Sequence, residues 1–561
     1  MAFGILEPRL SSGETVPGTV RLFDQGLGID QQLEFGHGID IRSLSSRLKR
    51  DGDIILVPQP SDSPNDPLNW PTLKKDFVLF VLCLAVIMSS AASPLIASSS
   101  IVLLLNLGHD FRGVALLTGW HLAAGAITSL FVTAIAVKYG KRFIYLFALV
   151  FLIAGAAWGG AATSYRSLLG ARILQGVGLA PFEVLMNTSI GDMYFVHQRG
   201  YRLAIANLCL FGTTFMTPLI GGHISRNMSW HWLFWFLLIF TCIAFILVFL
   251  FLPEHVYKRS VILDIDYEGE GMLMEAIAGE PSSGTSEISR IAGNEEGTEK
   301  PPQAIEEKPE TWLHSLRLFS GSKSDRPLWK IFLRPFALVL HPGIWWAALI
   351  QAPLIAWTVI IGLILAAIFL GPPLWYNDAD VGNMYTGALV GSIVGFIFSG
   401  TASDFIAKFL SKRNNNVYEP EYRILLVVAQ LACGCAGIWG FGITSNNLYK
   451  YSKYLPPFFF GLESCGMIIG AVASASYVTD AYRHIQVEAM VFLVLVKNLV
   501  SFALTDRGYE WVRDTGIKHA FVVAGSIQAA ISAFSLLNWF FGKYCRYYAH
   551  KYDILKILHL E

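Results

Sequence analysis

Charge is scarce in this 561-residue sequence. Only 15% of the residues are Asp, Glu, Lys or Arg, and 42 basic residues balance 42 acidic ones. An ordinary soluble chain is nearer a quarter charged. The balance leaves no whole-chain basic field, so nucleic acid is not an expected partner. Hydrophobic residues make up 53% of the chain, which is typical of a protein that lies mostly inside a bilayer.

Several patterns that bear chemistry are also missing. The seven cysteines form no paired C-x-x-C motifs, so neither a metal site nor a cofactor is expected. No G-x-x-x-x-G-K-S/T loop is present, which leaves ATP hydrolysis by this chain without support. The sequence shows no nucleophile–base constellation, so we expect no catalytic residues and no enzyme. The first 70 residues lack a signal-peptide pattern, and the first membrane segment is expected to act as its own insertion signal.

Long apolar runs are abundant instead. About 20 apolar residues are needed to cross the hydrocarbon of a bilayer, and the sequence contains twelve runs of about that length. Their limits are 77–105, 114–137, 143–163, 167–190, 201–224, 230–253, 343–370, 381–403, 422–444, 454–479, 485–506 and 519–542. The expected fold class is therefore an all-α integral membrane protein with twelve transmembrane helices.

The twelve runs fall into two groups of six, separated by a hydrophilic stretch. From Asp264 to Glu310 acidic residues outnumber basic ones by 13 to 3, so we interpret this stretch as a flexible linker. Residues 1–65 have the composition of a loop and are also expected to be unstructured. The expected division of the chain is an N-terminal tail 1–76, a six-helix bundle 77–253, an acidic linker 254–342, a second bundle 343–543 and a C-terminal tail 544–561.

The orientation follows from the basic residues near the spans. Lys and Arg number 18 on the side of the termini and 8 on the opposite side, and the side with more of them is normally cytoplasmic. Both termini and the acidic linker are therefore expected in the cytoplasm. Trp70 is interpreted as an interfacial anchor, and Lys74 and Lys75 as the inside charge. The plasma membrane is favoured, with the vacuolar membrane as the alternative, and we expect a monomer.

The two groups of spans share landmarks at equivalent places. The second span ends in a basic loop at residues 133–142, and the eighth does so at residues 400–408. The fourth span ends in Asp192-Met193-Tyr194, and the tenth ends in Asp480-Ala481-Tyr482. These pairs predict a duplicated six-helix unit, so the bundles form a pseudo-repeat. Transporters are often built from such repeats, with the binding site between them.

These landmarks resemble motifs of the major facilitator superfamily. Gly140-Lys141-Arg142 matches the end of its G-x-x-x-D-x-x-G-R-K/R signature, although Thr133 and Val137 replace the first Gly and the Asp. Residues 172–178, RILQGVG, match R-x-x-Q-G-x-G, and residues 217–222, TPLIGG, resemble the antiporter motif G-P-x-x-G-G. The resemblance implies the fold of that superfamily.

A closer resemblance is to fungal members near the drug:proton antiporter-1 branch and to related polyamine and histidinol carriers. It rests on motifs spread from about residue 66 to residue 546. These are DPLNWP at 66–71, GDMYFVHQRG at 191–200, WHW at 230–232, LPE at 252–254 and NNNVYEPEYR at 414–423.

Ionisable groups inside spans are costly to bury and are functional candidates by default. Glu183 and Glu463 are the expected proton-coupling carboxylates, because burial lets a carboxylate hold and release a proton in the working range. Arg172 joins them on the strength of its motif. A structural alternative pairs Glu183 with Arg172, and another makes Lys497 the counter-ion of Glu463. The candidate substrate-binding residues are Phe182, Gln351, Lys497 and Asn498.

The resemblance also implies a gating latch between helix ends on the cytoplasmic side. Its expected residues are Gly140, Lys141, Arg142 and Asp404, with Asp192 as the substitute for the carboxylate that Val137 lacks. Pro218 is expected to serve gating, since it lies in a run of small residues that lets helices approach closely.

The function expected is secondary transport of a small organic compound, such as a drug, toxin or secondary metabolite, by alternating access. The expected partners are this small molecule, protons and the lipid bilayer. Proton-coupled export is favoured because the motifs resemble those of drug:proton antiporters. Proton-coupled uptake of a cationic solute such as a polyamine stays open, as does a membrane receptor that kept the fold without transporting.

Overall fold

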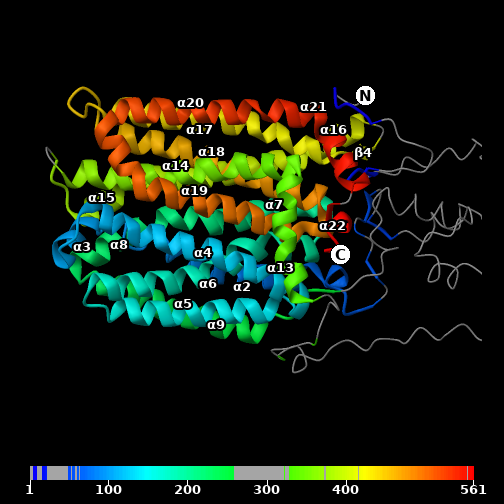
Figure 1. The fold of residues 1–561 in the computed structure, drawn as a ribbon, viewed down its shortest axis with the longest axis horizontal. Helices are drawn as coiled ribbons and strands as arrows, with labels where there is room; N and C mark the ends of the chain where they lie inside the picture. Colours follow the sequence, from blue (N-terminus) through cyan, green and yellow to red (C-terminus); the bar gives the residue numbers. More distant parts are fainter. Residues whose placement is uncertain are drawn as a thin grey trace, which may run out of the picture.

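The helices of this protein lie side by side in two groups, with both chain termini at the same end (Figure 1). The computed structural model describes residues 4–8, 16–21, 49–51, 54–56, 58, 60–61, 63–257, 317, 321, 327–371, 374–414, 416–552 and 554–560. We call the end with the termini the termini side and the opposite end the far side. The acidic stretch from Asp264 to Glu310 lies outside the described residues.

The first bundle is built from the helices before residue 252. They are α2 (Thr72–Ala91), α3 (Ser100–Leu107), α4 (Phe111–Tyr139), α5 (Lys141–Gly160), α6 (Tyr165–Met193), α7 (Val196–Asn207), α8 (Thr213–Asn227) and α9 (His231–Phe251). A π-helical turn, η2 (Leu208–Gly212), joins α7 to α8, and a short 3-10 turn, η1 (Pro67–Asn69), precedes α2.

The second bundle begins after α13 (Leu328–Ala337), which runs across the other helices in Figure 1. Its long helices are α14 (Pro342–Leu370), α16 (Thr386–Arg413), α17 (Leu426–Ser445), α18 (Leu455–Ala481), α19 (Gln486–Thr515), α20 (Ile517–Ala533) and α21 (Ser535–Lys551). Shorter helices are η4 (Leu338–Leu340), α15 (Asp378–Met384), η5 (Pro420–Leu425), η6 (Arg483–Ile485) and α22 (Ile554–Ile557).

Two short antiparallel strand pairs complete the described structure. β1 (Val20–Arg21) pairs with β4 (Val417–Tyr418), and β2 (Arg50–Asp51) pairs with β3 (Ile54–Ile55). The first pair joins the N-terminal segment to the loop that follows α16. Residues 16–21 are therefore not unstructured, and that expectation is wrong for this part of the tail.

Eleven helical segments of the described chain are long and apolar enough to cross a membrane. With the 20-residue helix α2 they make twelve, so the prediction of twelve helices in two bundles is confirmed. The prediction of one helix over 77–105 is wrong, because α2 ends at Ala91 and α3 begins at Ser100. Pro94 explains the break, since proline has no N–H and its ring clashes with the carbonyl four residues earlier.

The two bundles meet along two seams. In the first seam α4 of the first bundle packs against α19 of the second. In the second seam the α7–η2–α8 segment packs against α15 and α16. Residues of α19 therefore face the first bundle along its length, from Gln486 on the termini side to Glu510 on the far side.

Candidate functional site

A buried ion pair joins the two bundles near the middle of α19. Lys497 Nζ on α19 donates to Glu183 Oε1 on α6, and Asn498 Nδ2 donates to Glu183 Oε2 at 2.8 Å. All three residues are buried. The ring of Phe211, in the π-helical turn η2, lies 5.6 Å from Lys497 Nζ. The pairing of Glu183 with Arg172 and that of Lys497 with Glu463 are both wrong, because α19 faces α6 of the other bundle.

Glu463 lies on α18 inside the second bundle and is fully buried. Thr358 of α14 donates its hydroxyl to Glu463 Oε1 at 2.7 Å. The second oxygen, Oε2, has no hydrogen-bond partner among the described residues, and no described cation lies beside it. An ionised carboxylate is costly to bury without a partner, so this site favours the protonated acid. In a protonated Glu463 the proton would lie on Oε2, the oxygen that accepts no hydrogen bond from the described residues.

Close packing of helices shapes the surroundings of Glu463. Gly437 of α17 lies against the backbone of Glu463, and a Cβ on Gly437 would come within 2.3 Å of the Glu463 nitrogen. Helix α17 therefore covers this side of Glu463 closely. Thr358, which donates to Glu463, also lines the space between the bundles.

Arg172 is also fully buried and has no carboxylate partner within the described chain. Its guanidinium donates to the carbonyls of Ala92 and Ser93, the latter at 2.6 Å, and to Gln175 Oε1 at 2.9 Å. The two carbonyls are free because the helix of the first span breaks before Pro94. Arg172 thus closes the broken end of α2, where the helix dipole favours a cation.

A cavity of about 90 Å³ lies between the two bundles. Hydroxyl groups and aromatic rings form much of its wall. The hydroxyl-bearing residues are Ser93, Ser100, Thr118, Thr214, Thr358 and Thr505, and the aromatic residues are Phe111, Phe215, Tyr385 and Phe460. Thr358 connects this wall to Glu463, and the Ser93 carbonyl connects the opposite wall to Arg172. The cavity therefore lies between Glu463 and Arg172. Among the described residues, Glu463 has no cation beside it and Arg172 has no carboxylate partner.

The residues that line this cavity are largely not those predicted from the sequence. Phe182 is buried against Tyr145 in the first bundle, with ring centroids 5.3 Å apart. Lys497 and Asn498 bind Glu183 instead of lining the cavity, and Gln351 is not among the lining residues. The hydroxyl residues were missed because serine and threonine are common on packed helix faces in membranes.

On the termini side, a network of charges connects the bundles. Asp404 Oδ2 of α16 accepts from the Tyr201 nitrogen of α7 at 3.2 Å. Arg423 donates its Nε to Asp480 Oδ2 at 3.2 Å, and its Nη1 lies 3.8 Å from Asp404 Oδ1. Arg199 of α7 lies 3.8 Å from Asp480 Oδ1. These contacts hold the start of α7 against α16 and α18.

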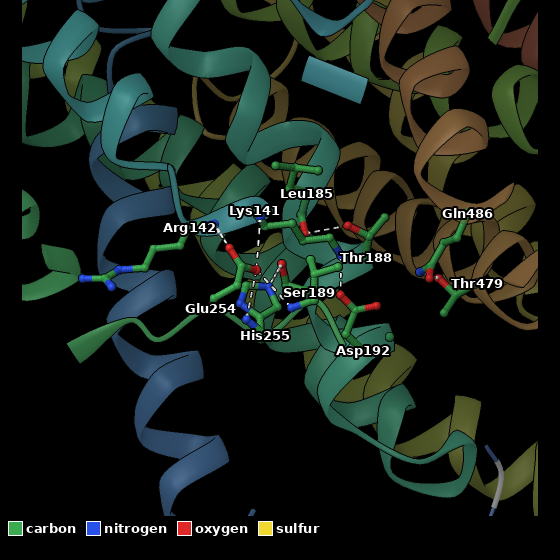
Figure 2. Close-up of polar contacts among 12 residues, drawn as sticks. Lys141, Arg142, Leu185, Thr188, Ser189, Asp192, Glu254, His255, Thr479 and Gln486 are labelled. Carbon is green, nitrogen blue, oxygen red and sulfur yellow. Dashed lines mark hydrogen bonds and ion pairs between the residues drawn. The ribbon is translucent and has the colours of Figure 1, made fainter. Parts of the chain in front are cut away.

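The first bundle has its own network at the same end (Figure 2). Gly140, at φ 92°, makes the turn between α4 and α5. Lys141 Nζ donates to Asp192 Oδ2 at 2.5 Å, so the carboxylate expected as the substitute is paired with Lys141. Glu254 accepts from the nitrogens of Lys141 and Arg142 at 3.3 and 3.2 Å. Glu254 was missed as a site residue, although it belongs to the LPE motif.

His255 belongs to this network and gives a pH prediction. Its Nε2 lies 2.8 Å from Ser189 Oγ (Figure 2). Its ring is nearly parallel to that of Tyr145, with ring centroids 6.5 Å apart. Burial lowers the pKa of His255, an effect that Glu254 and Asp192 oppose and Lys141 reinforces. The unfolded chain takes up this proton below about pH 6.5, whereas the folded chain does so only at lower pH. The contribution of neutral His255 to the stability of the folded protein is therefore complete above about pH 6.5 and is lost as the pH falls.

We expect the melting temperature of the detergent-purified protein to fall by about 2–4 °C more between pH 7.5 and 5.5 than that of His255→Gln. The exposed His519→Gln serves as the control, and it should behave like the parent protein. An equal pH dependence in His255→Gln and the parent would contradict this assignment.

On the far side, the bundles touch through very close backbone contacts. A Cβ on Gly222 of α8 would come within 2.3 Å of the Asp378 carbonyl, and one on Gly382 of α15 would come within 2.6 Å of the Pro218 carbonyl. Ser225 Oγ donates to Asp378 Oδ2 at 2.8 Å, and Arg112 Nη2 donates to Asp506 Oδ1 at 2.6 Å. Pro218 thus lies at a bundle contact. The bundles are therefore in contact at both the termini side and the far side.

Gly222→Ala is expected to open the far side, because the added methyl group cannot fit against a backbone carbonyl. A cysteine placed at Thr118, in the cavity wall, should then react about threefold faster with a maleimide than in the parent. Gly221→Ala is the matched control, since the nearest atom to its Cβ is a flexible Leu233 methyl at 3.3 Å. Equal rates in both variants would show that Gly222 does not hold this side closed.

Two six-helix bundles that enclose a cavity and meet at both ends define the class of secondary membrane transporters. The chain belongs to the major facilitator superfamily, whose family model, Major Facilitator Superfamily, matches residues 77–505. It is a multi-pass membrane protein and a transporter of small molecules, and the predictions of this family and of a non-enzyme are confirmed.

Three relatives from fungi match most of this chain. An uncharacterised MFS-type transporter of Schizosaccharomyces pombe is 26% identical over 91% of this chain and 89% of its own. Protein HOL1 of Saccharomyces cerevisiae is 24% identical over 97% of each chain. Efflux pump vrtL of Penicillium aethiopicum is 23% identical over 82% of this chain and 85% of its own.

The solved structure of the human organic anion transporter MFSD10 (TETRAN) shares the fold. Its TM-score is 0.52 at 14% identity, covering 83% of this chain and 100% of that one.

Proposed function

We propose that this transporter exports a small organic compound in exchange for protons, and that Glu463 is the proton site. The observation that supports this most is the pairing of Glu463 with a threonine hydroxyl and with no cation among the described residues. Such a carboxylate holds a proton while it is buried and can release it when it meets water, whereas an ion-paired one is held ionised. Similarity to an efflux pump supports the direction.

In this proposal the termini side is cytoplasmic, as the basic residues near the spans predict. Thr358 lies between Glu463 and the cavity wall, so a proton reaches Glu463 when the cavity opens on the far side. Neutral Glu463 lets the bundles close around the cavity without burying an isolated charge. Release of the proton on the cytoplasmic side prepares the protein for the next molecule of substrate.

A second candidate is proton-coupled uptake of a cationic solute. The observation that favours it is the environment of the Lys497 ammonium, which combines the Glu183 carboxylate with the Phe211 ring face. A carboxylate and an aromatic face are the groups that hold ammonium ions in proteins. A substrate ammonium would then compete with Lys497 for Glu183.

Transport by cells separates these candidates. The protein would be expressed in a yeast that lacks its main exporters, and intracellular levels of azoles, polyamines and planar fungal metabolites would be measured by mass spectrometry. Depletion that an uncoupler abolishes is the expected result. Enrichment of polyamines would favour uptake instead. No change for any compound, with the protein at the membrane, would favour a receptor.

A further inference from the structure

The N-terminal residues dock on the second bundle at the termini side (Figure 1). We call residues 4–8 and 16–21 the N-terminal strap. The Leu6 nitrogen donates to the Phe540 carbonyl at 3.0 Å, and β1 pairs with β4 through Val20 and Tyr418. Ile5 is only 1% exposed. These contacts join the start of the chain to residues about four hundred and more positions away.

The strap completes a buried cluster of charges in the second bundle. Arg546 of α21 donates to the Pro17 carbonyl and to Glu419 Oε2 and Glu421 Oε2, the last two at 3.0 and 2.7 Å. Thr19 Oγ1 donates to Glu419 Oε2 at 2.7 Å. A buried guanidinium needs partners for its donors. Removing the strap would therefore leave Arg546 and Glu419 each without one partner.

The strap also lies against the contact between the bundles. Gly18 has φ +82°, and a Cβ there would come within 3.0 Å of the Asp480 carbonyl and of Ala481 Cα. The side chain of Asp480 faces Arg199 of the first bundle. Ile5 shares one apolar cluster with Val196 of α7 and with Ala407 and Leu410 of α16. Residues of both bundles thus meet around Ile5.

We propose that the N-terminal strap holds the termini side of the transporter closed and must detach from the second bundle before that side opens. Opening there separates α7 from α16 and α18, which breaks up the cluster around Ile5 and the contact behind Gly18. A contact made in only one of two conformations shifts their populations toward that conformation. The strap is short and pairs through two strand residues. Its docking is therefore reversible, and it shifts the population toward the closed termini side. The described contacts of the strap involve neither the cavity between the bundles nor Glu463, so its effect does not depend on the substrate or on proton coupling.

The test measures how readily the termini side opens. A cysteine would replace Ala204, which is fully buried on α7 beside Gly400 of α16, in a full-length protein whose seven native cysteines are replaced. Gly18→Val should expel the strap, because the side chain cannot fit against the α18 backbone. Labelling of the cysteine by a maleimide should become about fivefold faster. Equal labelling in Gly18→Val and its parent would overturn the proposal.

Gly321→Val is the matched control. Gly321 has φ +84°, like Gly18, but no atom of the described residues lies within 4 Å of its Cβ position. The same backbone strain is introduced without losing a contact, so its labelling rate should stay unchanged. Faster labelling in this control, equal to that of Gly18→Val, would also overturn the proposal.

Two further measurements guard against general loosening of the fold. Thr19→Val removes one hydrogen bond only, and it should raise the labelling rate about twofold. A second reporter cysteine at Thr118, in the cavity wall, should react more slowly in Gly18→Val, since opening one side depletes the opposite conformation. Faster reaction at both reporters would mean loosening of the whole protein, and the strap would not be a gate.

Discussion

Glu463→Gln is expected to abolish transport driven by a pH gradient while the protein stays folded. Glutamine has the shape of the protonated acid and keeps an oxygen for the Thr358 hydroxyl, which lies 2.7 Å from Glu463 Oε1. It cannot release a proton, so coupled flux should fall about tenfold or more. No described cation depends on Glu463, so the variant should be as stable as the parent or more stable, because a buried ionisable group is replaced by a neutral one.

The matched control is Asp514→Asn, the same change from acid to amide at an exposed position after the cavity-lining part of α19. Its flux should stay within about a factor of two of the parent, because exposed ion pairs contribute little. Exchange of labelled for unlabelled substrate should also fall in Glu463→Gln, because glutamine mimics the protonated acid, which must release its proton before substrate binds. Full pH-driven flux in Glu463→Gln would contradict the assignment of the proton site.

Lys497→Met is expected to destabilise the protein by about 3–5 kcal/mol, because it leaves the Glu183 carboxylate buried without its cation. Glu183→Gln should destabilise the protein by a similar amount, because it leaves the Lys497 ammonium buried without its carboxylate. The double variant should recover most of the stability, since neither charge remains. Thermal unfolding of the four proteins measures the coupling between the two residues.

Measuring the flux of the same four proteins separates the effect of the ion pair on stability from its effect on transport. The double variant should fold and reach the membrane, yet its flux should stay about tenfold or more below that of the parent. The reason is that the pair joins α6 to α19 across the seam that must rearrange during each cycle. A double variant with full flux would show that the ion pair serves assembly alone. Single variants as stable as the parent would contradict the pair itself.

Much of the fold follows from local features of the sequence. The lengths of the apolar runs give the number of spans, and the paired landmarks at Asp192 and Asp480 give the duplication. Local chemistry also places Asp404 and Gly140 at the termini side. These predictions succeed because bilayer thickness fixes the helix length, and because hydrophobicity alone identifies a span.

The partners of the buried charges could not be predicted, because they depend on which helices face each other. The alternative that pairs Lys497 with Glu463 assumes that consecutive spans are neighbours, whereas Lys497 of α19 binds Glu183 of α6 in the other bundle. The role of Arg172 depends on the helix break before Pro94. Its guanidinium binds the carbonyl of Ser93, which is 79 positions away in the sequence. Thr19 and Glu419 are 400 positions apart, so loop composition gave no sign that the strap docks.

Exchange of protons for the substrate through Glu463 can be measured in liposomes that contain the purified protein. A compound that cells export would be loaded inside them, and the internal pH would be followed with a trapped dye while the compound leaves. For the parent protein we expect the lumen to acidify in step with efflux, because protons enter as the compound leaves, and we expect this change to be lost in Glu463→Gln. Alkalisation of the lumen would contradict exchange and indicate co-transport. The same pH change in both proteins, or compound movement without any pH change in the parent, would contradict proton exchange through Glu463.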